Sequence, residues 1–445
     1  MPNIIAYLAI LIWPILSIYV YKRYPTLTAT FITVMGGYLL LPVNTAIDPP
    51  LIPPINKDTV VALSALVGRV YIKKLNISLV PSGGIERLLA IAYLVLPFFT
   101  FITNTEPLFD GRFWRPPLTI HDAIAGSFAN YMRMLTFILA LQLIKTSEDQ
   151  IKIFKYLTIA GLCYSLPILL EIRLSPQLHT WIYGFFPHVF GQQMRGGGYR
   201  AVVFLGHGLL VATFIFVALG SATIIWKNNI KLYGIPAFAV ILYLTIILVL
   251  SKTFSAYFLA MLLIPSLFFL SANVMNTLSK ALIYMVIFYP LMTFFKLFPQ
   301  QEIIEFVSGM NAERAGSLSY RFHMENILID HASEKFLFGW GGWNRNRPWG
   351  TVPDGYWIVI FGSQGLVGFL AIFGLAVSAT LKGIKACKSL ADKNEKFLLS
   401  ASILMIVILM IDQIPNSSLS GIYIWFLIGA VHGRANHILN MRNKN

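Results

Sequence analysis

The sequence predicts an all-α, polytopic integral membrane protein. Of its 445 residues, 57% are hydrophobic and only 12% are charged, whereas a soluble globular domain carries about a quarter charged residues. Long apolar runs recur from one end of the chain to the other, and about 20 apolar residues can span the hydrocarbon core as a helix. Because these runs do not alternate polar and apolar residues, they favour helices over the strands of a barrel.

Apolar runs define about thirteen candidate transmembrane helices in a single transmembrane domain, residues 1–445. The third candidate is the weakest, because it contains Arg69 and ends in Lys73 and Lys74. If it lies only at the interface, the number of spans is about twelve. The candidate spans are residues 4–21, 26–43, 59–78, 86–104, 122–144, 153–172, 201–226, 233–250, 254–271, 281–299, 355–378, 397–414 and 421–436.

Basic clusters predict which span ends face the cytoplasm. The net charge of +15 is explained largely by the excess of Lys and Arg in cytoplasmic loops, so it gives no reason to expect a nucleic-acid partner. Three loops then lie on the outer face, at about residues 104–121, 173–200 and 300–354. These loops also carry arginines, which the preference of Lys and Arg for cytoplasmic loops does not explain. The clusters taken as cytoplasmic are Lys22-Arg23, Lys73-Lys74, Lys145 to Lys155, Lys227-Lys231, Lys382 to Lys396 and the C-terminal Arg434, Arg442 and Lys444.

The long outer-face loop, residues 300–354, contains an amphipathic helix. From Ala312 to about Lys335, apolar residues recur at spacing four, and Arg321 and Glu325 form another i,i+4 pair. Gly339 ends the helical pattern, and a Gly- and Trp-rich turn follows, FGWGGWNRNRPWG. Long ordered loops in compact folds are usually functional, so we expect a site here.

The residues from Ser319 to Leu370 carry the strongest local signal. They run SYRFHMENILIDHASEKFLFGWGGWNRNR and then PDGYWIVIFGSQGLVGFL, with glycines at 362, 365 and 368. An earlier stretch, GQQMRGGGYRAVVFLGHG, places an arginine before the next span. In motif order and topology, residues 120–415 resemble the bacterial O-antigen ligase and O-antigen polymerase superfamily. Where that family usually carries a His, this chain has Asp354.

The resemblance implies a glycosyltransferase without a cofactor or metal. Its donor would be a glycan on a polyprenyl pyrophosphate, and its acceptor a hydroxyl of a glycan, a lipid or a protein. Arg200 and Arg321 are the leading candidates to bind the pyrophosphate, because guanidinium groups bind phosphate oxygens bidentately and stay charged. Asp354 is the candidate general base, although an Asp before an apolar run also caps helices. Glu325 and His323 are alternative bases.

Other charged and aromatic residues are candidate substrate contacts. Arg133 and Lys252 lie in apolar runs, where charged residues are costly and often functional, although Lys252 also fits an outer hairpin. The tryptophans fit either an aromatic belt or a sugar-stacking groove. The candidate substrate-binding residues are Arg195, Glu325, Trp340, Trp343, Arg345, Arg347, Lys252 and Arg133.

The sequence lacks the signatures of several other classes. It has no P-loop, no HExxH motif, no DxD pair on an outer loop, and only two cysteines, which form no metal-type spacing. The alternative hypothesis is a transporter or flippase, which would predict related halves and charges at the midplane. The resemblance leads us to expect an enzyme of O-antigen or exopolysaccharide synthesis in a bacterial inner membrane, with its active site on the periplasmic face and membrane lipids around it.

Overall fold

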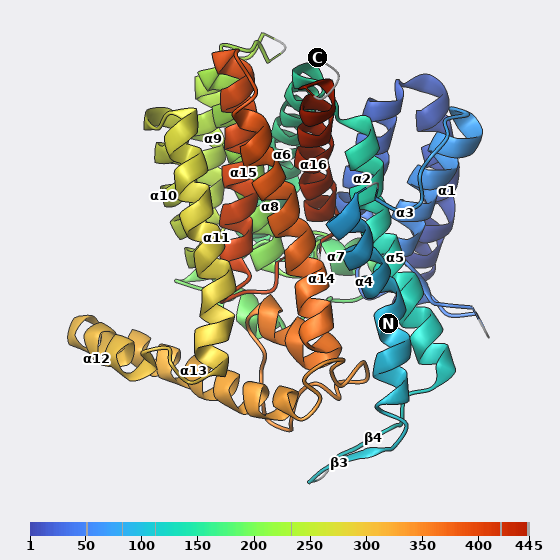
Figure 1. Cartoon of the computed structure of the whole chain (residues 1–445), viewed down its shortest axis with the longest axis vertical. Coiled ribbons are helices and arrows are strands. Elements are labelled where there is room, and N and C mark those ends of the chain that lie inside the picture. Colours follow the sequence, from blue (N-terminus) through green and yellow to red (C-terminus); the bar gives the residue numbers. More distant parts are fainter. Residues whose placement is uncertain (50–51, 82, 112, 233, 419–420, 443–445) are drawn as a thin grey trace.

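A computed structural model describes residues 1–49, 52–81, 83–111, 113–232, 234–418 and 421–442. Within these ranges the chain is mostly helical, with three short β-hairpins (Figure 1). The hairpins are antiparallel and are formed by β1 (Ala46–Ile47) with β2 (Ile55–Asn56), β3 (Leu108–Asp110) with β4 (Phe113–Arg115), and β5 (Met194–Arg195) with β6 (Gly198–Tyr199). The helices are α1 (Ile4–Arg23), α2 (Thr26–Leu40), α3 (Lys57–Val67), α4 (Gly84–Ile102), α5 (Ile120–Leu143), α6 (Ser147–Leu174), α7 (Leu178–Tyr183), α8 (Gly208–Lys227), α9 (Ala237–Leu250), α10 (Phe254–Phe269), α11 (Ala272–Phe294), α12 (Gln300–Met310), α13 (Ala312–Ser333), α14 (Tyr356–Cys387), α15 (Lys393–Asp412) and α16 (Ile422–Arg442).

The helices confirm an all-α, multi-pass membrane protein. In the part of the chain that the structure describes, eight helices are long and apolar enough to cross a bilayer, namely α1, α4, α5, α6, α8, α11, α14 and α15. Three shorter helices, α2, α9 and α10, are also apolar. Many large apolar side chains on α1, α4 and α11 are solvent-exposed in the isolated chain, as expected for surfaces that face lipid.

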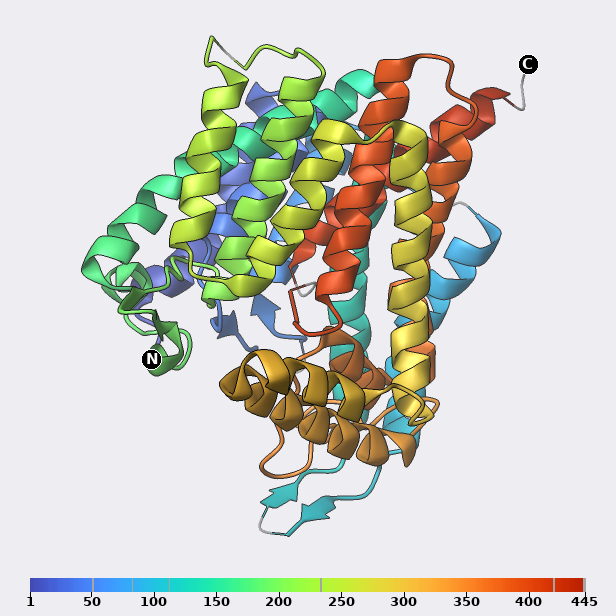
Figure 2. The ribbon, with the colours of Figure 1, turned by 90° about the vertical axis from the view of Figure 1, so that its left-hand side faces the viewer.

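The bundle has two different ends. Helices α12 and α13 and the β3–β4 hairpin lie at one end, which we call the α13 end; the N-terminus lies toward it (Figures 1 and 2). The last turn of α16 and the ends of α8 and α9 that face each other lie at the other end. We call this the basic end, because the lysines and arginines in the last turns of α1 and α14 and just after α5 gather there.

Two predicted segments differ from the structure. The span expected at residues 59–78 consists of the short α3 and a π-helical turn, Gly68–Ile72, so no long apolar helix forms there. The span expected at 281–299 instead begins at Ala272 as α11. Two polar residues of this earlier part of α11, Asn276 and Ser279, are buried.

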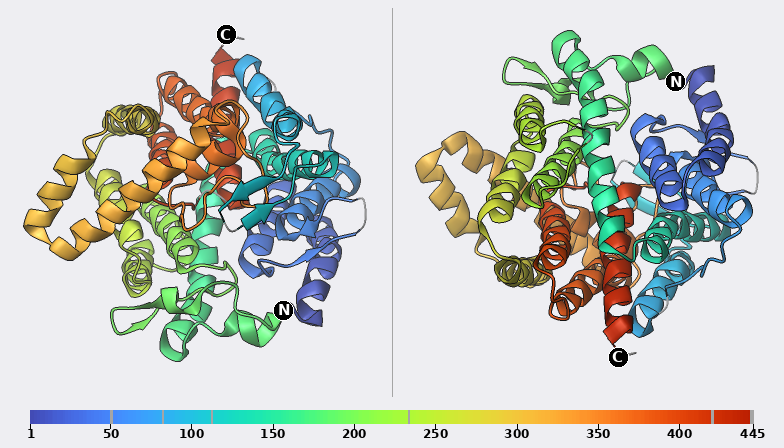
Figure 3. Two further views of the ribbon diagram at one scale, coloured as in Figure 1. Left: turned by 90° about the horizontal axis from the view of Figure 1, so that it is seen from below. Right: turned by 90° about the horizontal axis from the view of Figure 1, so that it is seen from above.

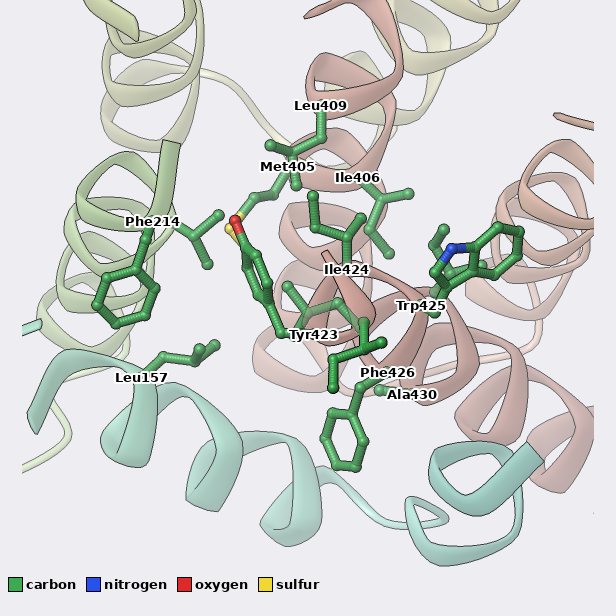
Figure 4. Packing of buried hydrophobic residues seen from close by; sticks show 14 of the residues in the cluster. Leu157, Phe214, Met405, Ile406, Leu409, Tyr423, Ile424, Trp425, Phe426 and Ala430 are labelled. Atoms are coloured by element: carbon green, nitrogen blue, oxygen red, sulfur yellow. The ribbon is translucent and has the colours of Figure 1, made fainter. Parts of the chain in front are cut away.

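The centre of the bundle is packed around α15 and α16. Tyr423 of α16 lies between Phe214 of α8 and apolar residues of α15 (Figure 4), and Phe426 of the same helix contacts Phe31 of α2. Helix α16 also packs tightly against α5. A Cβ atom on Gly429 would lie 2.2 Å from the carbonyl oxygen of Phe137, so only glycine permits this close approach of two backbones.

Helix α14 is interrupted at Gly365, which has φ 64° and ψ −166°. The turn that precedes α14 docks into the interruption through backbone hydrogen bonds. Leu366 N donates to Phe336 O (2.8 Å), and Trp340 N donates to Gly362 O (2.9 Å). A Cβ on Gly365 would lie 2.4 Å from Leu337 O. The glycines of the 362–368 motif therefore hold the Gly-Trp-Gly turn against the bundle.

The segment 300–354 contains two helices. The sequence predicted one helix from Ala312 to about Lys335; α13 ends at Ser333, and Gly339, with φ 72°, lies in the turn beyond it. The additional helix α12 has no buried residue. Seen from the α13 end, α13 runs beneath the bundle, and α12 joins it at an angle at the edge of the molecule (Figure 3).

Replacing Gly365 with alanine should destabilise the fold. The new Cβ would need a left-handed backbone conformation and would overlap Leu337 O, at a cost of about 2–4 kcal/mol. Thermal unfolding in detergent should show a lowered midpoint for Gly365→Ala. Gly316→Ala is the control, because a Cβ there meets no atom within 4 Å. An equal midpoint in both variants would contradict this account of the interruption.

Candidate functional site

Arg321 and Asp354 form an ion pair at the α13 end. Arg321 Nε lies 3.4 Å from Asp354 Oδ2, and the two side chains are 47% and 43% exposed. The sequence suggested Glu325 as the partner of Arg321 on the same helix; the structure pairs Arg321 with Asp354 instead. An ion pair this exposed contributes about 1 kcal/mol or less to stability, so either member can change partner at little cost.

Asp354 does not cap α14. The N-cap residue is Gly355, and no side chain caps that end. The backbone there is held by the loop after α15, because Tyr356 N donates to Asn416 O (2.9 Å) and a Cβ on Gly355 would lie 2.1 Å from Ile414 O. The Asp354 carboxylate is therefore left to face Arg321.

Glu325 lies one turn beyond Arg321 on α13 and is largely buried. Tyr289 Oη donates to Glu325 Oε2 (2.7 Å), and Trp357 Nε1 donates to Glu325 Oε1 (3.0 Å). Burial, with a smaller contribution from the charge of Asp354, raises the pKa of Glu325 to about 7 against the lowering effect of these two hydrogen bonds. A carboxyl group with a pKa near neutrality is suited to proton transfer.

These three charged residues line one cavity of about 100 Å³. Its walls come from α11, α13, the start of α14 and the loop after α15. Apolar side chains form most of the remaining wall, and they are Leu318, Phe322, Leu328, Val352, Ile358 and Ile414. The cavity thus combines a cation, an accessible carboxylate and a buried carboxyl group in a mostly apolar surface.

Arg200 lies in a second, separate cluster at the same end. Its side chain is buried, with 3% of the residue exposed; Nη2 donates to Thr253 (2.9 Å), and Nε has no acceptor among the described residues. Burial and, to a smaller extent, the charge of Arg195 lower the pKa of Arg200 to about 10. Burial and the charge of Arg200 likewise lower the pKa of His207 to about 4. This region therefore disfavours positive charge in the absence of an anion.

Contacts at the start of α10 link the Arg200 cluster to α13. Thr253, which binds Arg200, precedes Phe254, and the Arg314 guanidinium lies 4.9 Å from the Phe254 ring centroid. Arg321 follows Arg314 by seven residues, or about 10 Å along α13. Arg200 and Arg321 thus lie at one end of the bundle, although Arg200 does not line the Arg321 cavity.

Lys252 and Arg195 stabilise the β5–β6 hairpin. Lys252 Nζ donates to Arg195 O (3.1 Å) and Gly196 O (3.0 Å). Lys252 itself lies in the turn between α9 and α10, as the outer-hairpin interpretation expected, with φ 48°. The Arg195 side chain is exposed. These contacts give Lys252 a structural role in holding the loop before Arg200.

Arg345 and Trp340 hold the long loop together. Arg345 is 2% exposed, and Nη1 donates to Pro116 O (2.8 Å). His331 Nε2 donates to Arg345 O (2.8 Å), and the His331 ring stacks on the buried Trp340 ring, with centroids 4.5 Å apart. In this conformation neither Arg345 nor Trp340 offers a surface for stacking a sugar.

Arg347 and Trp343 contact the β3–β4 region. Arg347 donates to the side chain of Asn344, and its carbonyl accepts a hydrogen bond from Arg115 (3.2 Å). Trp343 Nε1 donates to Asp122 Oδ1 (2.9 Å), but its ring is 61% exposed. Of the two candidate tryptophans, Trp343 alone presents an open ring face.

Arg133 lines another cavity, of about 390 Å³, together with Lys57 and Asp58. Lys57 is buried; its Nζ donates to Leu41 O (3.1 Å) and Phe204 O (3.3 Å). Sequence reasoning missed Lys57 and Asp58. The available signal was a Lys-Asp pair directly before an apolar run, which resembles an ordinary helix start. Across the described ranges, no three His, Cys, Asp or Glu side chains are grouped to hold a metal ion.

Glu325 should make stability depend on pH. The folded protein keeps the Glu325 proton to a higher pH than the unfolded chain does. The contribution of Glu325 to the free energy of unfolding is therefore complete below pH 4.5 and is lost as pH rises toward 7. The loss is on the order of 3 kcal/mol. Thermal midpoints of wild type and Glu325→Gln should therefore diverge between pH 4.5 and 7, with wild type losing more. A constant difference in midpoint across this range would contradict the claim that burial raises the pKa of Glu325.

No protein-family model matches this chain, and no curated protein matches it. The resemblance to the O-antigen ligase and polymerase superfamily therefore rests on the order of the motifs and on the residues named above.

Proposed function

We propose that this chain is a membrane glycosyltransferase of the O-antigen ligase and polymerase type. It transfers or polymerises a glycan from a polyprenyl-pyrophosphate carrier during synthesis of a surface polysaccharide. The observation that carries the proposal is the Arg321–Asp354 pair, which lines one cavity with Glu325. A phosphate-binding cation beside two carboxyl groups is what this transfer requires.

The proposal includes the topology. Thirteen described helices, α1 to α6, α8 to α11 and α14 to α16, would cross the membrane if α3 and its π-helical turn count as one crossing. The excess of Lys and Arg at the basic end assigns that end to the cytoplasm. The α13 end, with segment 300–354, then faces the periplasm of a bacterial inner membrane, and the N-terminus lies outside.

In the proposed reaction, Arg321 binds the donor pyrophosphate. The guanidinium exchanges the Asp354 carboxylate for phosphate oxygens. This exchange costs little free energy, because the ion pair is exposed to solvent. Arg200, which lies at the same end of the bundle but outside the Arg321 cavity, is proposed as a second cation for a donor long enough to reach both clusters, and an anion would relieve the unfavourable burial of its guanidinium. As the sugar C1–O bond breaks, the leaving pyrophosphate keeps the bonding electron pair, and these cations stabilise its charge.

Asp354, released from Arg321, then accepts the proton of the acceptor hydroxyl. The hydroxyl oxygen attacks C1 as the pyrophosphate departs, so one C–O bond forms while another breaks. Glu325 holds or passes on a proton near neutral pH, because its pKa is about 7. The acceptor can be a lipid core, a second lipid-linked repeat or a protein side chain, since all three present a hydroxyl group.

A transporter or flippase is the second candidate function. The observation that favours it is the cavity with Lys57, Asp58 and Arg133, because charges inside a bundle often mark a substrate path. That function predicts that glycan precursors are trapped on the inner leaflet when the cavity is altered, whereas the transferase predicts precursors accumulating on the outer leaflet.

Substitutions in the Arg321 cavity should abolish transfer. In a deletion strain complemented with each variant at matched membrane expression, Arg321→Ala should lower surface polysaccharide by about 100-fold or more. Asp354→Asn should have a comparable effect. Lipid-linked precursor should accumulate, as single repeats if polymerisation fails and as long chains if ligation fails.

The matched control is Arg173→Ala, which removes an exposed arginine at the end of α6 that does not line the cavity. It should complement fully. Full complementation by Arg321→Ala and Asp354→Asn as well would refute the proposed site, and precursor trapped on the inner leaflet would favour the transporter.

A further inference from the structure

The basic end of the bundle contains a cavity of about 720 Å³ that the proposed reaction does not use. Four parts of the chain form it: the turn after α3, the end of α5, the end of α14 and the end of α16. Its charged and titratable lining residues are Arg69, Lys145, Lys382, Lys385, His437 and Arg442, and no carboxylate of the described residues lines it. A cavity of this size can hold a small-molecule ligand.

Arg69 is built into the wall of this cavity. Only 5% of the residue is exposed. Its Nη1 donates to Leu139 O (3.2 Å) and its Nη2 to Gln142 Oε1 (3.4 Å), while Nε has no acceptor in the part of the chain that the structure describes. A buried cation with an unpaired donor is costly, unless an anion completes its surroundings.

Two carboxylates near this end, Glu86 and Glu395, are already engaged. Glu86 Oε1 accepts a hydrogen bond from Lys382 Nζ (2.9 Å), and it also lies 3.8 Å from His432 Nε2. Glu395 Oε2 accepts one from Arg434 Nη2 (2.7 Å).

Four lining cations, Arg69, Lys145, Lys385 and Arg442, make no ion pair within the described ranges. The preference for cytoplasmic Lys and Arg explains scattered basic side chains at a membrane surface. It does not explain their convergence on one cavity that excludes acids.

We propose that this cavity binds the phosphate of an anionic phospholipid headgroup. Basic pockets between helices at the cytoplasmic side suit such headgroups, because the phosphate meets several cations while the acyl chains remain in the bilayer. Leu141 and Leu439 add apolar surface beside the cations. The lipid would join α3, α5, α14 and α16, and so connect distant parts of the chain.

Lipid titration followed by native mass spectrometry tests the proposal. Delipidated protein should bind phosphatidylglycerol at least about tenfold more tightly than phosphatidylcholine with the same acyl chains. The double variant Lys145→Gln and Lys385→Gln should weaken phosphatidylglycerol binding by about thirtyfold. Both lysines are exposed and make no ion pair within the described ranges, so the variant should fold, and an unchanged thermal midpoint without lipid checks this.

The control double variant is Lys22→Gln and Lys231→Gln, which removes two exposed lysines at the basic end that do not line the cavity. It should bind phosphatidylglycerol like wild type. Equal binding of the two lipids, or equal weakening in both double variants, would overturn the site.

Competition with glycerol phosphate separates a lipid from a soluble source of the phosphate. If a lipid is the ligand, glycerol phosphate should displace phosphatidylglycerol only at a concentration at least about a hundredfold higher, because it lacks the acyl chains. Displacement at comparable concentrations would overturn the lipid assignment and identify the ligand as a soluble phosphate compound.

Discussion

The interruption of α14 at Gly365 is the constraint on which the α13 end depends. Without a Cβ there, the backbone of residues 336–341 can approach and form hydrogen bonds with the open turn of α14. That contact fixes where α13 ends and where the chain returns to enter α14. It therefore determines that Arg321, at the middle of one helix, faces Asp354, just before the other. A continuous α14 would leave the long loop without its main backbone attachment.

The two ends of the bundle differ in how their charges are balanced. At the α13 end, Arg321 is paired with an exposed carboxylate, and Glu325 is buried among hydrogen-bond donors. Such a site can exchange partners and move protons. At the basic end, Lys382 and Arg434 hold Glu86 and Glu395, and no carboxylate of the described residues lines the cavity on which the other cations converge. That arrangement suits stable binding of an anion rather than chemistry.

Much of the fold followed from local pattern, but much of the site did not. Apolar runs predicted the multi-pass architecture, and i,i+4 spacing predicted most of α13, because both depend on nearby residues. The partner of Arg321 was not predicted, since Asp354 lies far along the chain and meets it only through the interruption of α14. Trp340, Arg345 and Lys252 looked like substrate contacts, yet each donates to a backbone carbonyl: Trp340 to His331 of α13, and the other two to distant loops. Lys57 and Asp58 were missed because their cavity forms between five separate segments.

Cross-linking in native membranes tests the central claim most directly. In a variant that lacks Cys163 and Cys387, the pair Arg321→Cys and Asp354→Cys should be joined by a short bifunctional thiol reagent. The same pair should not be joined once the further substitution Gly365→Val displaces the 336–341 turn. Efficient cross-linking that depends on Gly365 is the result that the account predicts. Absence of the cross-link in the variant that keeps Gly365, or its persistence in the variant that carries Gly365→Val, would mean that α14 does not position Asp354 against α13.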